Sequence, residues 1–387
     1  MTDTASIHVG INAFRLVGPQ TSIGTYTHEL IDALLSQGFT ITLYAPREEP
    51  GADLDRYLTP ESKCKVVFSP RPLQPECFPK DLFTWNQRVL PRMLTNHPCQ
   101  VFIAPYHQTP CFPPDGVRTL AVIHDLCGLR RDCGYRYFGR AWFTHFWNLL
   151  TAALRADRII PISESTRADM ARKFPFARKH MSAPIYNCVS GKTLEVGEAR
   201  HHVEPLGIPS TPFILAFGLT GPRKGFKTAM QAYTQYRNGG GTLPLVLIGV
   251  KNETHARSFI PAEQLRDVIF LPRVSACERD AIYRLATCLL FCSLCEGFGY
   301  PIVEAMRQGC PVIAARNTPA AEIVGDTLNL MHPPSAGSCA KLIRDYASLN
   351  ATRREELGQR LIQQSMRFAD ANFATRFAAE IRATLAS

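Results

Sequence analysis

Residues 289–315 of the chain read LLFCSLCEGFGYPIVEAMRQGCPVIAA and contain, in direct succession, a buried-strand pattern, a loop with two glycines and a short helix pattern. Pro301 suits the first turn of the helix, where a missing N–H leaves no intrahelical hydrogen bond unmade. Gly309 and Pro311 limit the helix to about eight residues. A strand, a tight loop and a helix in this order form the repeating unit of a parallel α/β sheet.

The same alternation of short apolar runs and helix-period segments covers nearly the whole chain, and it predicts two parallel sheets in tandem. A loop holding Gly18 and Gly24 is expected after the first strand, before a helix at 26–36. Residues 191–210 have little periodicity and are expected to be a linker. The expected strands are 7–12, 40–44, 101–104, 118–123 and 158–162 in the first half, and 213–217, 243–248, 268–271, 288–292 and 311–315 in the second.

The length and the charge of the chain limit its organisation and its partners. A chain of 387 residues exceeds what one core usually organises, so we expect two domains. The formal net charge is +10, and a surplus of seven positive charges falls between residues 130 and 179. Such a segment favours an anionic partner, and composition leaves open a nucleic acid, a membrane surface or a phosphorylated ligand.

Several features together predict a cytoplasmic protein. No apolar run approaches the roughly 18 residues of a membrane span, and the start of the chain lacks the pattern of a signal peptide. The thirteen cysteines are scattered through expected strands and helices, which suits reduced thiols. Cys292 and Cys295 have the spacing of metal ligands, but no second pair complements them, so we expect buried thiols there.

The start of the short helix is an expected anion site. Its first N–H groups and the positive end of its dipole lie at the carboxyl edge of the sheet, and Gly297 and Gly299 allow a close approach to the backbone. Glu304 is placed to accept two ribose hydroxyls, and Glu296, at the end of the strand, suits a ligand rich in hydroxyls. The plainer interpretation is a capped helix with acidic residues that favour its dipole.

A second expected anion site is the segment FGLTGPRKGFK at 217–227, where another strand ends in a glycine-containing loop. Arg223 can bind a phosphate through two N–H groups, and Lys224 supplies a mobile point charge. Alone, a basic loop of this kind is more often solvated surface. Two such loops in one domain predict a single diphosphate between them, and therefore a nucleotide-linked ligand.

The two glutamates, in the form EGFGYPIVEAM, together with FGLTGPRKGF before them and GCPVIAA after them, resemble the retaining GT-B glycosyltransferases of family 4. The first half resembles the same family in VIHDL at 122–126, in INAFRLVGPQTSIGTYTHELIDALL at 11–35 and in ADRIIPISESTRADM at 156–170. The resemblance implies two Rossmann-like α/β domains facing across a cleft. The first is the acceptor-side domain at 1–190, and a final helix at about 370–387 crosses back to it. The second, at 191–369, binds the nucleotide sugar.

The resemblance also implies roles for particular residues. Glu296, His124, Lys224 and Arg223 would be catalytic, with the cations on the diphosphate and His124 lining the reacting side of the first domain. The family often has an arginine where this chain has Leu219, which gives Arg223 and Lys224 more of the phosphate contact. No metal and no cofactor is expected besides the GDP- or UDP-linked substrate. The implied donor-binding residues are Glu304, Gly297, Phe298, Gly299, Gly18, Gly24 and Ser293.

The expected activity is that of a retaining hexosyltransferase in polysaccharide biosynthesis. It would move a sugar, with mannose as the leading candidate, to a glycan, lipid-linked or small-molecule acceptor, by front-face attack in which the leaving phosphate takes the acceptor proton. Two alternatives stay open: a sugar-nucleotide epimerase of the same fold, and a non-catalytic nucleotide-sugar-binding subunit of a glycan assembly complex. No nucleic-acid partner is expected.

The segment from Arg130 to Trp147 interleaves arginines with aromatic residues. One hypothesis is a surface that contacts anionic lipid at the inner face of the plasma membrane. RNA stacking is a rival, but no RNA-binding motif accompanies the segment. The plainer interpretation is a helix with Trp142, Phe146 and Leu149 in the core and its arginines in solvent.

Overall fold

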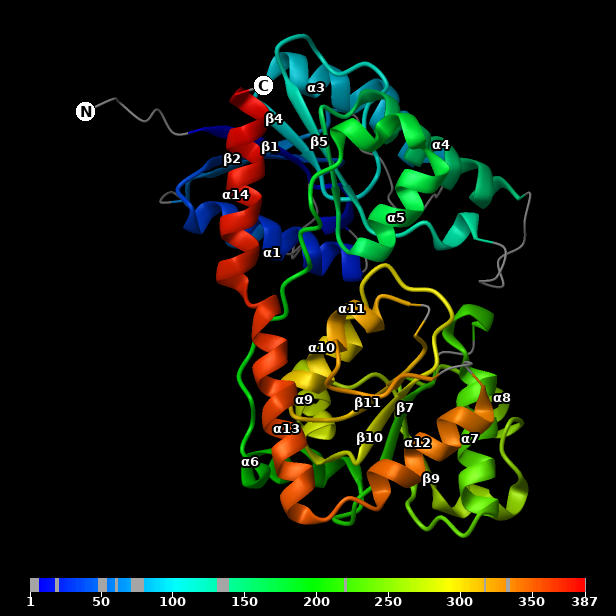
Figure 1. Ribbon diagram of the computed structural model, residues 1–387. Helices are drawn as coiled ribbons and strands as arrows, with labels where there is room; N and C mark the ends of the chain where they lie inside the picture. The colour runs from blue at the N-terminus through cyan, green and yellow to red at the C-terminus, as the bar shows by residue number, and fades with distance from the viewer. Residues whose placement is uncertain are drawn as a thin grey trace. The chain divides into compact units, whose positions relative to one another are not determined.

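The computed structural model describes residues 7–17, 21–47, 54–59, 62–70, 80–130, 139–218, 221–316, 318–331 and 335–386. These residues form two compact units (Figure 1). Unit 1 contains the described residues up to Leu129, residues 139–188 and the C-terminal helix, and unit 2 contains Arg130 and the described residues of Val189–Ala369. The chain therefore enters unit 2 after Cys188, two residues before the expected boundary, and returns to unit 1 at Asp370.

Unit 1 is built on a six-stranded parallel sheet with the order β3-β2-β1-β4-β5-β6. Its inner strands are apolar and buried on both sides, which is why the sequence shows them as continuous apolar runs. The strands are β1 (His8–Asn12), β2 (Thr40–Ala45), β3 (Cys64–Phe68), β4 (Val101–Ala104), β5 (Arg118–Ile123) and β6 (Arg158–Pro161).

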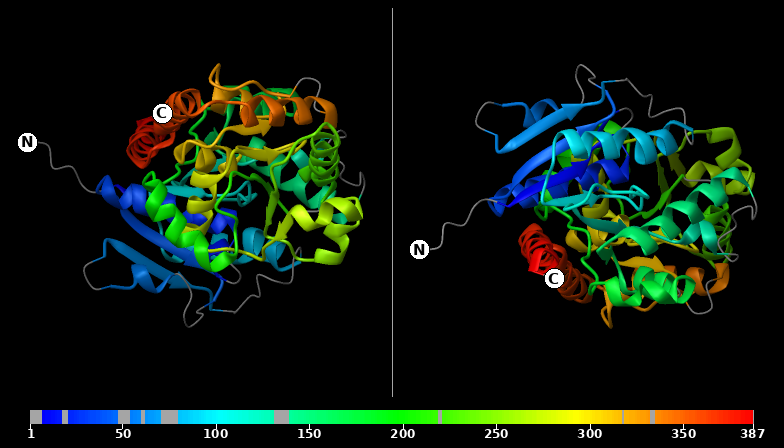
Figure 2. Two further views of the ribbon diagram at one scale, coloured as in Figure 1. Left: turned by 90° about the horizontal axis from the view of Figure 1, so that it is seen from below. Right: turned by 90° about the horizontal axis from the view of Figure 1, so that it is seen from above.

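Helices cover this sheet. One cluster of buried side chains joins the segment of α2 and α3 to Tyr44 of β2 and Phe102 of β4, and another joins α4 and α5 to β5. The C-terminal helix α14 packs against α1, next to the blue N-terminal part of the unit (Figure 2). The helices are α1 (Ser22–Ser36), α2 (Lys80–Thr84), α3 (Leu90–Asn96), α4 (Arg140–Arg155), α5 (Glu164–Lys173) and α14 (Asp370–Ala386).

Unit 2 is built on a five-stranded parallel sheet with the order β11-β10-β7-β8-β9. Its strands are β7 (Ile214–Phe217), β8 (Leu245–Ile248), β9 (Val268–Phe270), β10 (Cys288–Phe291) and β11 (Val312–Ala314). Its helices are α6 (Val196–Val203), α7 (Phe226–Asn238), α8 (Glu253–Arg257), α9 (Ala276–Leu285), α10 (Tyr300–Arg307), α11 (Ala320–Val324), α12 (Ala336–Ala347) and α13 (Ala351–Ser365).

The strand orders locate the functional edge of each sheet. In both units the first strand lies inside the sheet, and the chain builds outward first on one side of it and then on the other. The order therefore reverses between β1 and β4 in unit 1 and between β7 and β10 in unit 2. Ligands of open α/β sheets bind outside the carboxyl ends of the strands at such a switch point. The expected Rossmann-like α/β architecture is confirmed in both units.

Three local expectations are wrong. Strand β3 was not expected, because the lysine after its first residue interrupts the apolar run. Residues 191–210 are not a plain linker, because α6 forms within them and packs against α9. The first helix begins at Ser22, not at Tyr26, since Thr21 caps it. No helix in the described part of the chain is long and apolar enough to span a bilayer.

Candidate functional site

The loops that follow β7 and β10 flank the switch point of unit 2 and pack directly on each other. Gly225, which precedes α7, has φ of 64°, and a Cβ there would lie 1.9 Å from the carbonyl oxygen of Cys292. The Leu294 N–H donates to the Arg223 carbonyl at 2.8 Å. Only glycine satisfies both the backbone angle and the contact at position 225. The two basic residues before it are therefore fixed against the end of β10.

The Glu296 carboxylate is the centre of this arrangement. The Lys224 Nζ lies 2.7 Å from its Oε1, and the Ser293 hydroxyl donates to the same oxygen at 2.6 Å. The Arg223 Nη1 lies 3.1 Å from its Oε2 and donates to the Cys295 carbonyl at 2.7 Å. The side chain of Glu296 is only 12% exposed, whereas those of Arg223 and Lys224 are 24% and 26% exposed. The carboxylate thus orients two cations that solvent or a ligand can still reach.

Glu304 lies on α10 and is held from α9. The Tyr283 hydroxyl donates to its Oε2 at 3.1 Å, and the Arg279 Nη2 lies 3.2 Å from its Oε1. Burial raises the pKa of the Glu304 carboxyl, although Arg279 and the Tyr283 hydrogen bond act in the opposite direction. Each carboxylate oxygen has a second lone pair, so the fixed group can accept two further hydrogen bonds from a ligand.

The helix that carries Glu304 has the limits that the sequence predicts. Gly299 precedes α10 with φ of 108°, Pro301 lies in the first turn, and the helix has eight residues. Gly309 follows it with φ of 74°. Phe298 is buried, with its ring centroid 5.5 Å from those of both Tyr300 and Phe368. Its side chain therefore anchors the loop, and a contact with a ligand would involve its backbone.

His124 lies at the carboxyl end of β5 in unit 1 and is buried. Its Nε2 is 2.7 Å from the Pro105 carbonyl oxygen, which can only accept, so Nε2 carries the proton. Burial lowers the pKa of His124, and the ring of Tyr26 lies edge-on to it with the centroids 4.7 Å apart. The side chain is a neutral imidazole whose other nitrogen has the lone pair.

A second buried histidine, which the sequence pattern does not single out, lies beside this position. His107 follows β4 at the switch point, is 1% exposed, and has no hydrogen-bond partner at either ring nitrogen among the described residues. The Nε2 of Gln108 and the hydroxyl of Thr109 also lack partners there. The ring of His145 from α4 lies 4.6 Å from that of His107. The only signal in the sequence is a run of three polar residues that begins three positions after a buried strand.

The N-terminal glycines differ from the expectation or fall outside the described residues. Gly18 lies outside them, as does Leu219. Gly24 was expected in a loop, but it lies in the first turn of α1, and its N–H donates to the Thr21 hydroxyl at 3.1 Å. A Cβ at Gly24 would approach the Arg15 carbonyl oxygen to 3.1 Å. The glycine lets the helix start close to the preceding turn.

The expectation that the cysteines are reduced thiols is wrong for two of them. Cys295 is disulfide-bonded, and so is Cys127 of unit 1. The Sγ of Cys292 lies 3.8 Å from the Sγ of Cys339, and both are buried free thiols. Among the described residues, no group of three or more His, Cys, Asp or Glu side chains is arranged to hold a metal ion.

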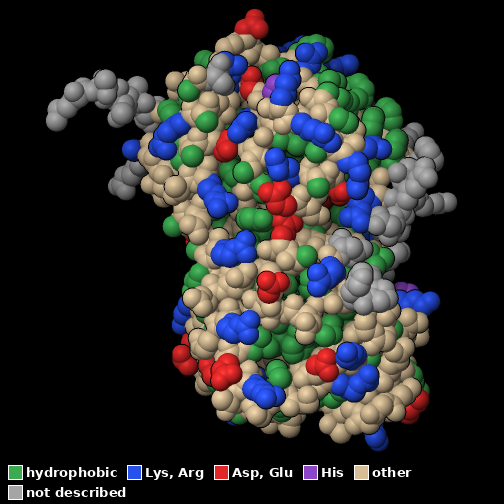
Figure 3. All heavy atoms as spheres, viewed as in Figure 1, with side chains coloured by type: hydrophobic (Ala, Val, Ile, Leu, Met, Phe, Trp, Pro, Cys, Tyr) green, Lys and Arg blue, Asp and Glu red, His purple; other side chains and the backbone are tan. Residues whose placement is uncertain are grey.

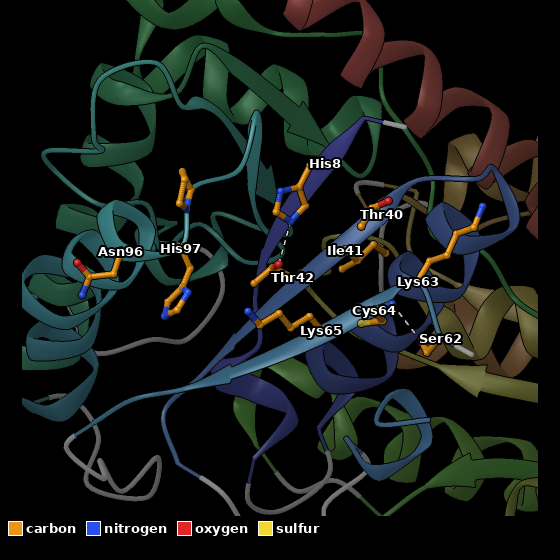
Figure 4. Close-up of a pocket in the computed structure, with 11 residues that line it drawn as sticks. His8, Thr40, Ile41, Thr42, Ser62, Lys63, Cys64, Lys65, Asn96 and His97 are labelled. Atoms are coloured by element: carbon orange, nitrogen blue, oxygen red, sulfur yellow. Dashed lines mark hydrogen bonds between the residues drawn. The ribbon is translucent and has the colours of Figure 1, made fainter. Parts of the chain in front are cut away.

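A pocket of about 470 Å³ lies at the other edge of the unit 1 sheet, where strands β1, β2 and β3 begin (Figure 4). His8 and Thr42 meet inside it, with the Nε2 of His8 2.8 Å from the Thr42 hydroxyl. Lys65 and His97 lie at its sides in Figure 4. None of the site residues named from the sequence lines this pocket.

Comparison with known proteins identifies the family. The model of the glycosyl transferases group 1 matches residues 200–364, which hold both glutamates and both cations of unit 2. The model of glycosyltransferase family 4 matches residues 23–190, nearly all of unit 1 after its first strand. The chain belongs to the group 1 glycosyltransferases. The two matched segments of this glycosyltransferase follow each other along the chain in the order that the sequence predicts.

Curated relatives of this glycosyltransferase include mannosyltransferases. The chain is 28% identical, over 284 residues, to the serotype-specific mannosyltransferase WbdA of Escherichia coli. The aligned part covers 69% of this chain and 34% of that relative. The chain thus spans about a third of the length of the curated relatives it matches first.

Solved structures show the same fold. The sucrose-phosphate synthase from Thermosynechococcus elongatus has a TM-score of 0.77 and 17% identity, over 98% of this chain and 99% of that chain. Anabaena Alr3699/HepE, solved in complex with UDP-glucose, has a TM-score of 0.70 and 15% identity, over 97% of this chain and 100% of that one. The GT-B fold class expected from the sequence is confirmed.

Proposed function

We propose that the chain transfers a hexose from a nucleoside diphosphate sugar held on unit 2 to a hydroxyl of an acceptor held on unit 1. The observation that carries the proposal is the cluster of Arg223 and Lys224 on Glu296, at the switch point of a Rossmann-like sheet. This cluster supplies a net positive charge where nucleotides bind in such folds. Glu304, held by α9 on the same edge, is the proposed acceptor of the ribose hydroxyls.

The cations are suited to a diphosphate leaving group. The Lys224 ammonium has three N–H donors and directs one to Glu296, so others remain for phosphate oxygens. Charge that develops on the leaving phosphate would be stabilised by Lys224 and by Arg223 without rearrangement of either side chain. We therefore propose that the reaction needs no resident metal ion.

Retention of configuration is proposed from the family resemblance, and a front-face route is proposed because the central carboxylate is a poor nucleophile. Glu296 accepts hydrogen bonds from Lys224, Arg223 and Ser293, which stabilise its charge and lower its reactivity. In a front-face reaction the bond from the anomeric carbon to the leaving phosphate oxygen breaks, and the bond to the acceptor oxygen forms on the same side. The acceptor proton passes to the leaving phosphate, so the protein supplies position and charge stabilisation.

Mannose is the proposed sugar, from GDP-mannose. Support comes from the relatives that are named mannosyltransferases. The likeness to a structure holding UDP-glucose shows the fold alone, so UDP-sugars belong in the same test.

The proposed acceptor is a glycan, free or lipid-linked, in polysaccharide biosynthesis. Unit 1 has buried neutral polar groups at and beside its switch point: His124, His107, Gln108 and Thr109. Neutral groups of this kind exchange hydrogen bonds with sugar hydroxyls without attracting the charged donor. A cytoplasmic site with peripheral contact at the inner face of the plasma membrane is part of this proposal.

Donor screening with and without acceptors tests the proposal. The purified chain is incubated with GDP-, UDP- and ADP-sugars and with mannosylated oligosaccharides, and nucleotide release is measured together with product configuration. The expected result is GDP release that depends on the acceptor, with a product of the donor's anomeric configuration. Conversion of the donor without an acceptor would favour the epimerase alternative. Donor binding without any turnover would favour the non-catalytic subunit.

A further inference from the structure

Helix α4 has a wider apolar arc than the core of unit 1 covers. Leu149 is fully buried, and Trp142 and Phe146 pack half-buried against the neighbouring core cluster, as the plainer interpretation expects. Phe143 and Leu154, however, are each 60% exposed. Packing in the core does not account for these two exposed side chains, and exposed apolar groups that gather on one surface mark interaction sites.

The exposed side chains of α4 form a continuous stripe. Successive residues of an α-helix are rotated by about 100°, so Phe143, Trp147 and Leu154 fall within an arc of about 40°. The rings of Phe143 and Trp147 stack with their centroids 6.4 Å apart. Trp147 is 38% exposed. The stripe runs along the helix beside its buried side.

Apolar residues extend the stripe on one of its sides. Phe146 borders it and contacts Phe174, and Phe174 contacts Phe176, which is 51% exposed. The Lys173 ammonium lies 6.0 Å from the centroid of the Phe146 ring. A cation therefore stands at this border of the exposed apolar side chains.

The other side of the stripe has a similar border. The Sγ of Cys111 lies 3.8 Å from the Thr151 hydroxyl of α4, which places the next residue, Phe112, along the helix. Phe112 is 74% exposed, and the Arg155 guanidinium lies 5.3 Å from the centroid of its ring. Together these exposed residues define the α4 surface: Phe112, Phe143, Trp147, Leu154 and Phe176.

Charge around the α4 surface has one dominant sign. Helix α4 contains no Asp or Glu. Arg155, Lys173, Arg178 and Lys179 are exposed at the end of α4 and on the neighbouring segment. Figure 3 shows hydrophobic side chains gathered at the edge of unit 1 over α4, with Lys and Arg side chains nearby. Five of the nine exposed large hydrophobic side chains among the described residues belong to this surface, so it is the main apolar surface of the described chain.

We propose that the α4 surface binds the interface of an anionic phospholipid bilayer. Trp and Phe side chains on a helix, flanked by cations and without carboxylates, have the chemistry that inserts at the boundary of headgroups and acyl chains. Lys173 and Arg155 stand where they can approach anionic headgroups while the aromatic rings enter the interface. The proposal rests on the proposed function for its purpose, bringing unit 1 to a membrane-borne acceptor, and not for the binding itself.

Vesicle co-sedimentation tests the surface directly. The full chain is mixed with vesicles of phosphatidylcholine alone or of phosphatidylcholine with phosphatidylglycerol, over a series of salt concentrations. The expected result is binding to the anionic vesicles that weakens as salt screens the charges. The triple variant Phe143→Ser, Trp147→Ser, Leu154→Ser is expected to bind about ten-fold more weakly, because it removes the inserted apolar groups. Lys173→Glu is expected to weaken binding about five-fold.

Matched controls separate the surface from general effects. Phe83→Ser and Met366→Ser each remove an apolar side chain that is 53% exposed elsewhere, and both are expected to bind like the wild type. Circular dichroism is expected to show the same helix content in all variants. Transfer to a soluble acceptor is expected to survive in the triple variant, since none of its three residues is placed in the proposed sites.

Three outcomes would overturn the proposal. The first is that the wild type does not bind anionic vesicles. The second is that the triple variant binds them as strongly as the wild type. The third is that the wild type is a dimer in solution without vesicles, whereas the triple variant is a monomer. The last would identify a second copy of the chain as the occupant of the surface. Vesicle binding without any transfer activity would leave this proposal standing while the proposed function fails.

Discussion

The two units have related strand orders but different chemistry at their switch points. In unit 2 the edge between β7 and β10 carries charge, with two cations paired to Glu296. In unit 1 the edge between β1 and β4 lies beside neutral imidazoles: His107 follows β4, and His124 follows the neighbouring β5. Because the topology is shared, the difference arises entirely from the residues of the loops.

The different residues at the two switch points would allow one fold to hold two kinds of substrate. A charged edge suits a diphosphate, while buried neutral donors and acceptors suit sugar hydroxyls. Burial lowers the pKa of His107 well below its ordinary value, and His145, His124 and Arg15 lower it further. Burial therefore keeps the His107 imidazole of unit 1 neutral at neutral pH, even with the Arg15 guanidinium nearby, whereas unit 2 presents two cations paired with Glu296. Four changes test this contrast.

Removing a cation from unit 2 is expected to have the largest effect. Lys224→Ala should lower kcat by about 100-fold or more, because the variant loses a donor to the leaving phosphate. Lys227→Ala is the matched control, since Lys227 is an exposed lysine in the first turn of α7, three residues further along the chain. Steady-state kinetics measure both. An unchanged kcat in Lys224→Ala would contradict the proposed role of the charged edge of unit 2.

Separating the two loops of unit 2 is expected to reduce stability. Gly225→Ala places a Cβ against the Cys292 carbonyl and forces an unfavourable backbone angle, which we expect to cost about 2–3 kcal/mol in the free energy of unfolding. Gly221→Ala is the control, because nothing lies within 4 Å of its added Cβ. Urea denaturation compares the two. Equal stabilities would show that the loops do not depend on this contact.

Titration of Glu304 is expected to make donor affinity depend on pH. Burial raises the pKa of this carboxyl, so protonation begins at a higher pH than for an ordinary glutamate. Donor affinity should therefore fall as the pH drops towards and through that raised pKa, because a protonated oxygen no longer accepts from the ribose. Glu304→Gln should bind donor about ten-fold more weakly, without this pH dependence. Calorimetric titration over a pH series measures both effects.

The stability of the chain supplies an internal control for this titration. The native state binds the Glu304 proton more tightly than the unfolded chain does, so this group raises the free energy of unfolding as the pH falls through its native pKa. The contribution of Glu304 to stability should therefore rise as the pH falls, whereas the donor affinity should fall. Donor affinity that is constant with pH in the wild type would argue against Glu304 as a ribose contact.

The smallest effect is expected in unit 1. His107→Phe should raise the acceptor KM about five-fold and leave the donor dissociation constant unchanged, because it removes both imidazole nitrogens. His107→Gln, which restores polar atoms, should recover part of the acceptor affinity. The Phe variant should also unfold at an equal or higher temperature, since it replaces buried nitrogens that have no partner among the described residues. A weaker donor affinity with an unchanged acceptor KM would reverse the assignment of the two edges.

The sequence predicts the fold well where apolar runs are continuous. Ten expected strands correspond to strands of the structure, because buried parallel strands need an unbroken apolar segment. Strand β3 escapes prediction because Lys65 breaks its run. Gly24 is misplaced because a helix cap at Thr21 outweighs the preference of glycine for loops.

The site is only partly predictable. The spacing of Glu296 and Glu304 around a loop and a short helix follows from local sequence, and so does the start of α10. The pairing of Glu296 with Arg223 and Lys224 joins residues about seventy positions apart and follows from the packing of two loops. His107 could not be found, because only its burial and its missing partners distinguish it from other histidines.

A crystal structure of the chain with GDP-mannose would show whether the charged edge of unit 2 holds the donor. The account predicts diphosphate oxygens within hydrogen-bond distance of the Lys224 ammonium or the Arg223 guanidinium. It also predicts ribose hydroxyls on the Glu304 carboxylate. A nucleotide bound elsewhere, with both cations still engaged only by Glu296 and no ribose at Glu304, would contradict the account.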